Sequence, residues 1–554
     1  MAKEKCDRHA YFIGGGLASL AGAVYLIRDF AFKGENIHIL ESLDILGGSN
    51  DGIGTPKEGF VCRGGRMLNE ETYENFWDLF HTIPSLERPG LSVTDEILEF
   101  DHAHPTHANA RLIDKDGSVL DVMSMGFDNS DRMKLTKLMV EPERNLDNLR
   151  IRDWFSPHFF TTNFWYMWQT TFAFQEWSSV CELKRYMNRM IYEFSRIQTL
   201  EGVTRTRFNQ YDSLIVPLKM YLEDFNVDFN LKCTVTDIDF KNTEDPEEII
   251  VRRIHYVRGN GKAGTKSNDN SKTDSKTENK AESKNGVINL KKKDICIFTC
   301  GCITDNSDEG DFKTPARYLP DNPPSADLWR KITAKKPGLG NPEPFFGHPD
   351  ETKWESFTVT SNGDKLLQMI EKYSRNVPGS GALMTFKDSS WRMSIVVAAQ
   401  PHFKNQPENQ TIFWGYGLYP DRVGDYVKKP MIDCTGEEML TELLHHLHFE
   451  DEADDIMKDV VNVIPSMMPY VDALFQCRAK ADRPKVIPKG SRNFAMVGQF
   501  VELPKDMVFT EEYSVRTARY AVYKLMGSDK KVLPVTPYNK QPEVLLRALN
   551  TMYR

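Results

Sequence analysis

The first 41 residues constrain the fold more than any other part of the chain. HAYFI (9–13) is a short apolar run, and GGGLAS (14–19) leads from it into LAGAVYLIRDF, which has helical spacing. IHILE (37–41) is a second strand-like run that ends in an acid. A strand, a glycine turn, a helix, a strand and an acid in this order predict a βαβ unit that binds a dinucleotide.

Each position of the glycine motif has a predicted task. Gly14 permits the tight turn, Gly16 lets the backbone approach a pyrophosphate, and the small Ser19 allows the helix to pack closely on the strand. The helix that begins at about Leu17 directs its N-terminal N–H groups at the phosphates. Glu41 lies at the usual distance for a partner of the ribose hydroxyls, and its charge disfavours the 2′-phosphate of NADP.

Two further segments favour FAD over NAD. A glycine pair precedes the loop RGGR (63–66), and this arrangement resembles the second FAD-contacting loop of glutathione-reductase-type flavoproteins. NFAMVGQF (493–500) is a strand with a glycine near its end, and a helix is expected to follow in VFTEEYSVRTARYAV. In that resemblance this strand and helix meet the flavin end of the cofactor. The expected contacts in these segments are Gly47, Gly48, Arg63, Gly65, Arg66, Gly498, Gln499, Thr510 and Glu511.

Length and composition are typical of a soluble enzyme with several domains. A chain of 554 residues is too long for one compact core, so several domains are expected. Its net charge of −9 argues against a protein that binds nucleic acid. We find no apolar run long enough to span a membrane and no secretory signal. Nine cysteines without a CxxC pair argue against a disulfide framework, so a cytoplasmic location is expected. Cys296, Cys300 and Cys302 and the histidines of HAHPTHA (102–108) are not expected to bind metal.

The segment 258–286, RGNGKAGTKSNDNSKTDSKTENKAESKNG, marks the clearest boundary. It has no Val, Ile, Leu, Met or aromatic residue and is predicted to be disordered. Its flanks EEIIVRRIHYV and GVINLKKKDICIF are strand-like, which predicts an overgrown hairpin tip. The expected FAD-binding domain combines 1–95, 205–312 and 481–530, the inserted substrate domain combines 96–204 and 313–480, and a helical tail occupies 531–554.

Aromatic residues are concentrated between residues 151 and 200. Helical spacing continues there to about Phe194, and the stretch is expected either as core or as the wall of a large apolar pocket. Trp165, Met167 and Trp168 are candidates for that wall. EEMLTELLHHLH (437–448) and PEVLLRALNTMYR (542–554) predict further amphipathic helices, of which the second packs as a lid or touches a membrane surface weakly.

Motifs along nearly the whole chain carry a resemblance to one family. They are YFIGGGLASLAGA, CRGGRM, ENFWDLF, NFWYMWQTTFAFQEW, ELKRY, FNQYDS, LGNP, CTGEE, MMPYV, DRP, NFAMVGQF and EEYSVRTA. In these motifs the sequence resembles the oleate hydratases, also called myosin-cross-reactive antigens. The resemblance implies an FAD protein that adds water to a mid-chain cis double bond of a free unsaturated fatty acid without net redox change. It also implies that Val235 and Gly301 contact the cofactor.

Adding water to an isolated alkene needs a proton donor, stabilisation of positive charge and a captured water. Tyr186 in CELKRYMNR occupies the position of the family's catalytic tyrosine, and an ordinary phenol keeps its proton at neutral pH. The resemblance assigns Gln210 and His402 to the fatty-acid carboxylate. Before this histidine the family reads Thr-x-Asn-Arg-Gln-Pro-His, whereas Val396 and Ala398 replace the threonine and the asparagine here. Two polar contacts to the carboxylate end are therefore missing.

The RGGR loop departs from the family at the position credited with activating water. The best-known members read RGGRE, whereas Met67 follows Arg66 here, and a thioether cannot usefully accept a proton. A branch of the family also reads RGGRM. We hypothesise that a nearby group substitutes, with Asn69, Glu70 and Glu71 as candidates, although both acids also suit the start of a helix.

These observations predict an α/β protein with a glutathione-reductase-type Rossmann FAD-binding domain, an inserted α+β substrate domain and a C-terminal helical cap. The leading function is a hydratase of oleate or linoleate, as a monomer or homodimer. The alternatives are a flavin-dependent lipid oxidoreductase or isomerase, and a non-catalytic protein that binds FAD and fatty acid.

Overall fold

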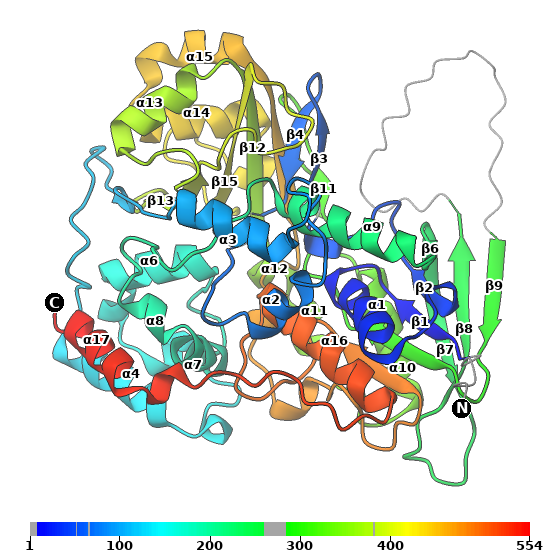
Figure 1. The fold of residues 1–554 in the computed structure, drawn as a ribbon. Coiled ribbons are helices and arrows are strands. Elements are labelled where there is room, and N and C mark those ends of the chain that lie inside the picture. Colours follow the sequence, from blue (N-terminus) through cyan, green and yellow to red (C-terminus); the bar gives the residue numbers. More distant parts are fainter. Residues whose placement is uncertain (1–7, 51, 65–66, 260–283, 381–382) are drawn as a thin grey trace, which may run out of the picture.

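A five-stranded parallel sheet contains the two strands of the predicted βαβ unit, β1 and β2 (Figure 1). The computed structural model describes residues 8–50, 52–64, 67–259, 284–380 and 383–554. The strands run in the order β17–β10–β1–β2–β6, and every neighbouring pair is parallel. Their bounds are β1 (Ala10–Ile13), β2 (Ile37–Leu40), β6 (Asp228–Asn230), β10 (Ile295–Thr299) and β17 (Phe494–Val497).

The predicted βαβ unit is present at the start of the chain. Helix α1 (Leu17–Phe30) connects β1 to β2 and is buried from its first residue to Ile27. Helix α16 (Glu511–Leu525) packs beside α1, next to α2 (Glu74–Phe80) (Figure 1). Because a parallel sheet needs cover on its faces, these helices bury the apolar strands. The predicted α/β class with a Rossmann-type sheet is confirmed.

A three-stranded antiparallel sheet contains the predicted hairpin. It is formed by β7 (Cys233–Phe240), β8 (Val251–Arg258) and β9 (Lys284–Asn289). The core of the predicted disordered insertion, 260–283, lies outside the described residues, whereas Arg258 and residues 284–286 belong to strands. GVINLKKKDICIF is not one strand, because the polar KKKD turn separates β9 from β10. Helix α10 (Pro324–Lys335) packs on β7, and β3 (Gly52–Thr55) pairs with β4 (Gly59–Cys62).

A seven-stranded sheet forms a second layer, in the order β11–β16–β12–β15–β14–β13–β5. All its neighbouring pairs are antiparallel except the pair β13–β5. Its side chains share an apolar core with α13, α14 and α15, which lie beside it at the top of Figure 1. The bounds are β5 (Leu112–Ile113), β11 (Asp308–Glu309), β12 (Trp354–Asn362), β13 (Leu383–Phe386), β14 (Met393–Val396), β15 (Gln410–Gly417), β16 (Val460–Met468), α13 (Lys365–Ser374), α14 (Gly436–His446) and α15 (Ala453–Asp459).

The aromatic stretch forms several short helices rather than one long helix. Pro157 begins a 3-10 turn, and Ala173 adopts the left-handed conformation that ends α6. Trp165, Met167 and Trp168 are buried in the core. The helices of this part of the fold are α3 (Val93–Ala103), α4 (Asn129–Val140), α5 (Ile151–Trp154), α6 (Asn163–Phe172), α7 (Val180–Arg189), α8 (Ile191–Phe194), α11 (Glu343–Phe346) and α12 (Pro349–Thr352).

The helical tail closes the fold against the aromatic helices. Helix α17 (Pro542–Met552) contacts α8 and lies beside α4 at the left of Figure 1. Arg132 of α4 donates a hydrogen bond to the Met552 carbonyl at 3.0 Å. The predicted C-terminal helix is therefore confirmed. Among the described residues, no helix combines the length and the apolar character needed to cross a bilayer.

Candidate functional site

A cavity of about 720 Å³ lies at the carboxyl ends of the parallel strands. The turns that follow β1, β2, β10 and β17 all contribute to its wall. In open α/β sheets this edge is where ligands bind, because the loops there surround a crevice and helix N-termini point into it. The geometry therefore favours a large, elongated ligand with phosphate groups.

Two glycine turns face each other across this cavity. Gly14 has φ +99°, a conformation that a side chain would strain, and its N–H donates to the Leu40 carbonyl at 2.8 Å. A bridge pairs Gly16 with Gly47. A Cβ on Gly16 would meet only the Gly48 Cα, at 3.8 Å, so the gap between the turns exists because both positions lack side chains. A pyrophosphate fits such a backbone cradle at the start of α1.

Polar side chains complete the large cavity. Glu41 accepts a hydrogen bond from the Gly15 N–H at 2.6 Å. Arg63 donates to the carbonyl oxygens of Gly48 and Thr304, each at 3.3 Å, so it joins two of the cavity loops. Burial raises the pKa of Asp305 to about 6.

Most residues predicted to bind the cofactor lie around this one cavity. Its wall contains Gly14, Gly16, Glu41, Gly47, Gly48, Arg63, Val235, Gly301, Gly498, Gln499, Thr510 and Glu511. Ser19 lies behind the wall, where it is buried and its hydroxyl is 3.1 Å from that of Thr299. Gly65 and Arg66 lie outside the described residues.

A second cavity of about 80 Å³ adjoins the first. Phe509 and Thr510 line both cavities, so this segment forms a wall that the two spaces share. The second cavity is enclosed mainly by aromatic and apolar side chains, and it has room for a few waters but not for an 18-carbon chain. We call it the phenol cavity, because Tyr73, Tyr186 and Tyr416 line it.

Tyr186 is held rigidly in the phenol cavity. It is 1 % exposed, and its hydroxyl donates to the Val508 carbonyl at 2.6 Å. The rings of Phe172, Phe174 and Phe475 surround it. Burial raises the pKa of Tyr186 well above that of an ordinary phenol, so the group carries its proton at all physiological pH values.

Met67 and the three candidates to replace the missing glutamate separate into two groups. Met67 and Asn69 line the phenol cavity. Glu70 does not line it, because its half-exposed side chain points toward His102, at 3.7 Å. Glu71 also lies outside the cavity and forms an ion pair with Arg196 at 3.0 Å. The structure therefore does not bring either acid to the phenol.

Of the four residues predicted at the fatty-acid carboxylate end, Val396 alone lines a cavity. Gln210 and His402 line neither cavity, although their loops touch, since the Asn209 N–H donates to the His402 carbonyl at 2.9 Å. Val396 lines the phenol cavity. Ala398 lines neither cavity, and its carbonyl accepts a hydrogen bond from Gln400 at 3.0 Å.

The imidazole of His402 gives a testable pH dependence. Burial and the positive charge of Arg205 lower the pKa of His402 to about 4. In the unfolded chain this histidine has an ordinary pKa of about 6.5. Between pH 4 and pH 6.5 the unfolded chain therefore binds more protons than the folded protein. The contribution of His402 to the free energy of unfolding is complete above pH 6.5 and is lost as the pH falls toward 4. We expect wild type, but not His402→Gln, to lose about 2 kcal/mol from this source between pH 7.5 and 4.5. Denaturant unfolding at both pH values measures it, and an equal loss in both proteins would refute the assignment.

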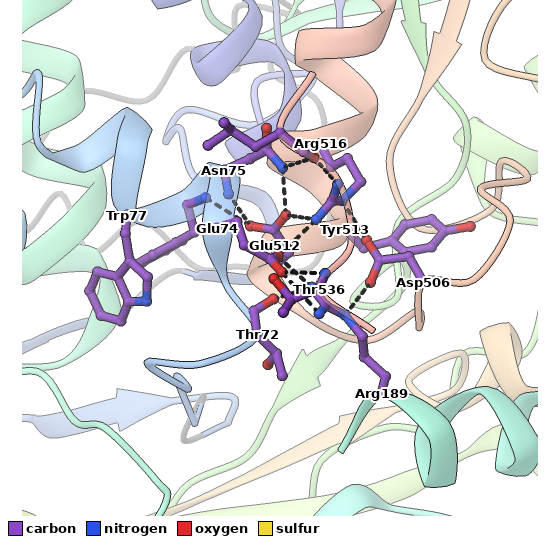
Figure 2. Close-up of polar contacts among 12 residues, drawn as sticks. Thr72, Glu74, Asn75, Trp77, Arg189, Asp506, Glu512, Tyr513, Arg516 and Thr536 are labelled. Carbon is purple, nitrogen blue, oxygen red and sulfur yellow. Dashed lines mark hydrogen bonds and ion pairs between the residues drawn. The ribbon is translucent and has the colours of Figure 1, made fainter. Parts of the chain in front are cut away.

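A buried ionic cluster fixes helix α7, which carries Tyr186, to the segment that separates the cavities (Figure 2). Arg189 lies 3.2 Å from Asp506, and Arg516 of α16 contacts the same carboxylate at 2.7 Å. Arg516 also contacts Glu74 at 2.9 Å and Glu512 at 2.8 Å. Since Asp506 precedes Phe509 by only three residues, the cluster connects the phenol to the wall of the large cavity.

Removing one charge from this cluster is expected to be costly. Asp506→Asn leaves two buried guanidinium groups with less compensation, and we expect a loss of about 3–5 kcal/mol in the free energy of unfolding. Glu99→Gln is the matched control, because its pair with Arg88 is exposed and should contribute less than about 1 kcal/mol. Chemical denaturation of the two variants makes the comparison, and similar small losses in both would contradict the role given to the cluster.

Two acids and one aromatic residue that line the cavities were not predicted from the sequence. Glu193 lines the phenol cavity, Asp305 lines the large cavity, and Phe509 lines both. An acid inside the otherwise apolar segment IYEF was the available signal for Glu193, because a buried charge needs a partner or a task. Nothing in the local pattern around Phe509 or Asp305 distinguishes them from ordinary loop residues.

A family profile and two relatives match nearly the whole chain. The profile of the MCRA family matches residues 7–523. The linoleate hydratase of Lactiplantibacillus plantarum is 39 % identical, with 100 % of this chain and 99 % of that protein covered. The oleate hydratase of Streptococcus pyogenes serotype M49 (strain NZ131) is 37 % identical over 95 % of this chain and 86 % of that protein. Cyclohexylamine oxidase from Brevibacterium oxydans IH-35A has a TM-score of 0.49 at 12 % identity, with 94 % of this chain and 99 % of that chain covered.

Proposed function

Because the chain belongs to the MCRA family, we propose that it is a hydratase that adds water to free unsaturated fatty acids of the oleate and linoleate class. The family predicted from the sequence motifs is confirmed. The single observation that carries the proposal for this chain is the common wall at Phe509 and Thr510, which places a buried phenol next to a dinucleotide-sized cavity.

FAD is the cofactor that the large cavity fits. In this proposal the glycine turns at Gly16 and Gly48 receive the pyrophosphate, and Glu41 turns toward the ribose. Thr510 and Glu511, at the start of α16, line the large cavity and would hold the flavin end of FAD. When bound, the flavin holds this end of the site in shape and sets the charge beside the alkene, without net transfer of electrons.

Tyr186 is the proton donor of the proposed reaction. Its phenol gives a proton to one alkene carbon, and a water held in the phenol cavity adds to the other carbon. The surrounding phenylalanine rings exclude bulk water and can stabilise the positive charge that develops on carbon. The hydrogen bond that the Tyr186 hydroxyl donates to the Val508 carbonyl keeps the phenol oriented before the alkene binds.

Binding of the acyl chain requires side chains around the phenol cavity to move. The cavity of about 80 Å³ admits only the region of the double bond. Each methylene that is buried contributes roughly 0.8 kcal/mol, so an 18-carbon chain has enough gross binding energy to drive such a rearrangement. The carboxylate then reaches toward Gln210 and His402, where Ala398 in place of the family's asparagine leaves one polar contact fewer than the family pattern provides.

Mass spectrometry of the product tests the function. The purified chain is incubated with FAD, a reductant and oleate or linoleate, with stearate and methyl oleate as controls. We expect a product heavier by one water, no change in stearate and little turnover of the ester. A loss of two hydrogens would instead support a lipid oxidoreductase, and unchanged lipid with retained flavin would support a binding protein.

Several narrower predictions remain part of this proposal. They are the monomer or homodimer state, the cytoplasmic location, the weak membrane contact of the tail and the boundaries of the discontinuous domains.

A further inference from the structure

Glu193 is the only carboxylate among the described residues that line the phenol cavity. It lies on α8, seven residues after Tyr186, which corresponds to about two helical turns. Although α7 and α8 are separated by Met190, the Met190 N–H still donates to the Tyr186 carbonyl at 2.7 Å, so the two side chains reach the same space. The side chain of Glu193 is buried, at 4 % exposure.

One oxygen of this carboxylate is fixed, and the other is available. Oε1 accepts a hydrogen bond from the Asn69 side chain at 3.0 Å and a second from Arg196. Among the described contacts, none gives Oε2 a hydrogen bond, and Glu193 lines the phenol cavity. Gly202 makes room for the carboxylate, since a Cβ there would lie within 2.3 Å of both oxygens.

We propose, on the basis of the function proposed above, that Glu193 orients the attacking water and accepts its proton. In this way it takes the place of the glutamate that Met67 replaces. Asn69 is a positioning residue, because it holds Oε1 and thereby turns Oε2 toward the water. This assignment differs from a role for Glu70 or Glu71, whose side chains lie outside the cavity.

The proposed step balances without an external reactant. The Tyr186 O–H bond breaks as its proton bonds to one alkene carbon, and the alkene π pair forms that new bond. The water oxygen bonds to the cationic carbon and loses one proton to Oε2 of Glu193. The proton then passes through cavity water from Glu193 to the Tyr186 phenolate, which restores both groups and leaves the alcohol.

The electrostatic surroundings of Glu193 suit a group that accepts a proton and later releases it. Burial raises the pKa of this carboxyl, Arg196 opposes the rise, and Glu71 adds to it. Among the described residues, the other titratable groups that line the cavity are the phenols of Tyr73, Tyr186 and Tyr416. A carboxyl with a raised pKa accepts a proton more readily than an ordinary glutamate and still returns it.

Glu193→Gln tests the proposal, because it keeps the shape of the side chain and removes the charge. We expect kcat for oleate to fall at least 100-fold, while KM and flavin content change less than threefold. Glu442→Gln is the matched control, since Glu442 is equally buried, accepts backbone hydrogen bonds at residues 425–427 and lines neither cavity. A variant Glu193→Gln with more than a third of the wild-type kcat would overturn the proposal.

A relocated carboxylate separates a catalytic role from a structural one. Met67 lines the same cavity, so Met67→Glu combined with Glu193→Gln places an acid on the other side of the water. We expect the double variant to recover at least tenfold over Glu193→Gln. If the double variant folds, retains flavin and shows no recovery, the carboxylate of Glu193 acts only in the structure and the proposal is wrong.

The wild-type pH profile keeps the proposal testable if Glu193→Gln does not fold. We expect kcat to fall with decreasing pH along a one-proton limb whose midpoint lies above the ordinary glutamate pKa of about 4.5. A flat kcat between pH 4.5 and 7.5 would overturn the assignment. Failure of wild type to hydrate any fatty acid would instead refute the function itself, so the two failures are distinguishable.

Discussion

Replacing Tyr186 with phenylalanine is expected to lower the hydration rate about 1000-fold, because general acid catalysis typically contributes factors of 10²–10⁴. The ring and its contacts with Phe172 and Phe174 remain, so the shape of the cavity is conserved. The lost hydrogen bond leaves the Val508 carbonyl without this donor and costs about 1–2 kcal/mol of stability. Initial rates with oleate, together with flavin content, measure the effect.

Tyr73→Phe is the control for this experiment. Tyr73 lines the same cavity and donates its hydroxyl to the Met67 carbonyl at 3.0 Å, so the variant removes an equivalent buried hydroxyl. We expect its rate to fall less than tenfold. If Tyr186→Phe retained more than a tenth of the wild-type rate with normal flavin content, Tyr186 would not be the proton donor.

Gly16→Val is expected to abolish flavin binding without unfolding the chain. Gly16 has φ −77°, an ordinary value for any residue, and a Cβ there meets nothing closer than the Gly48 Cα at 3.8 Å. The flavin-free protein should therefore melt within about 2 °C of flavin-free wild type, since less than about 0.5 kcal/mol is lost. The branched side chain fills the space where the pyrophosphate approaches the backbone, and we expect less than a tenth of the wild-type flavin content and no measurable hydration.

Gly14→Ala separates backbone strain from occupation of the cradle. Gly14 has φ +99°, and a Cβ there would lie 3.1 Å from the Thr299 Cβ, so this variant should destabilise the flavin-free protein as well. Absorbance of the bound flavin and thermal melts of both forms make the comparison. Retention of flavin by Gly16→Val would contradict the placement of the pyrophosphate.

The glycine motif could be predicted because its signal is local. The strand, turn and helix from Ala10 to Phe30 are consecutive, and the apolar spacing of each element follows its own period. Two other turns around the large cavity, at Gly301 and Gly498, are hundreds of residues away. Gly498 was connected to Gly14 by the resemblance to glutathione-reductase-type flavoproteins, and Gly301 by the resemblance to the oleate hydratases. No local pattern shows that β10 pairs with both β1 and β17.

Side-chain direction in the aromatic stretch could not be predicted. Trp165, Met167 and Trp168 lie on a helix that is apolar on most of its surface, so the periodicity does not show which face meets a ligand. The structure buries these three residues in the core and turns the following residues, 170–173, toward the phenol cavity. The left-handed residue Ala173 ends the helix there, and its small side chain gave no sign of it.

The sequence offers only proximity to Met67 as a guide to the residue that replaces the family's glutamate. Asn69 does line the phenol cavity, whereas Glu70 and Glu71 pair with His102 and Arg196 outside it. The cavity takes its carboxylate from Glu193, more than a hundred residues later, which only tertiary packing of α8 against the segment that contains Asn69 brings close. Asn69, bonded to Glu193, connects the two parts of the chain.

Hydration of oleate in D2O enriched in ¹⁸O tests the central claim most directly. We expect the product to contain one ¹⁸O at the hydroxyl and one deuterium on the neighbouring carbon, while the absorbance spectrum of the bound flavin is the same before and after turnover. A product without solvent oxygen, or a turnover that changes the redox state of the flavin in proportion to the lipid converted, would contradict the account.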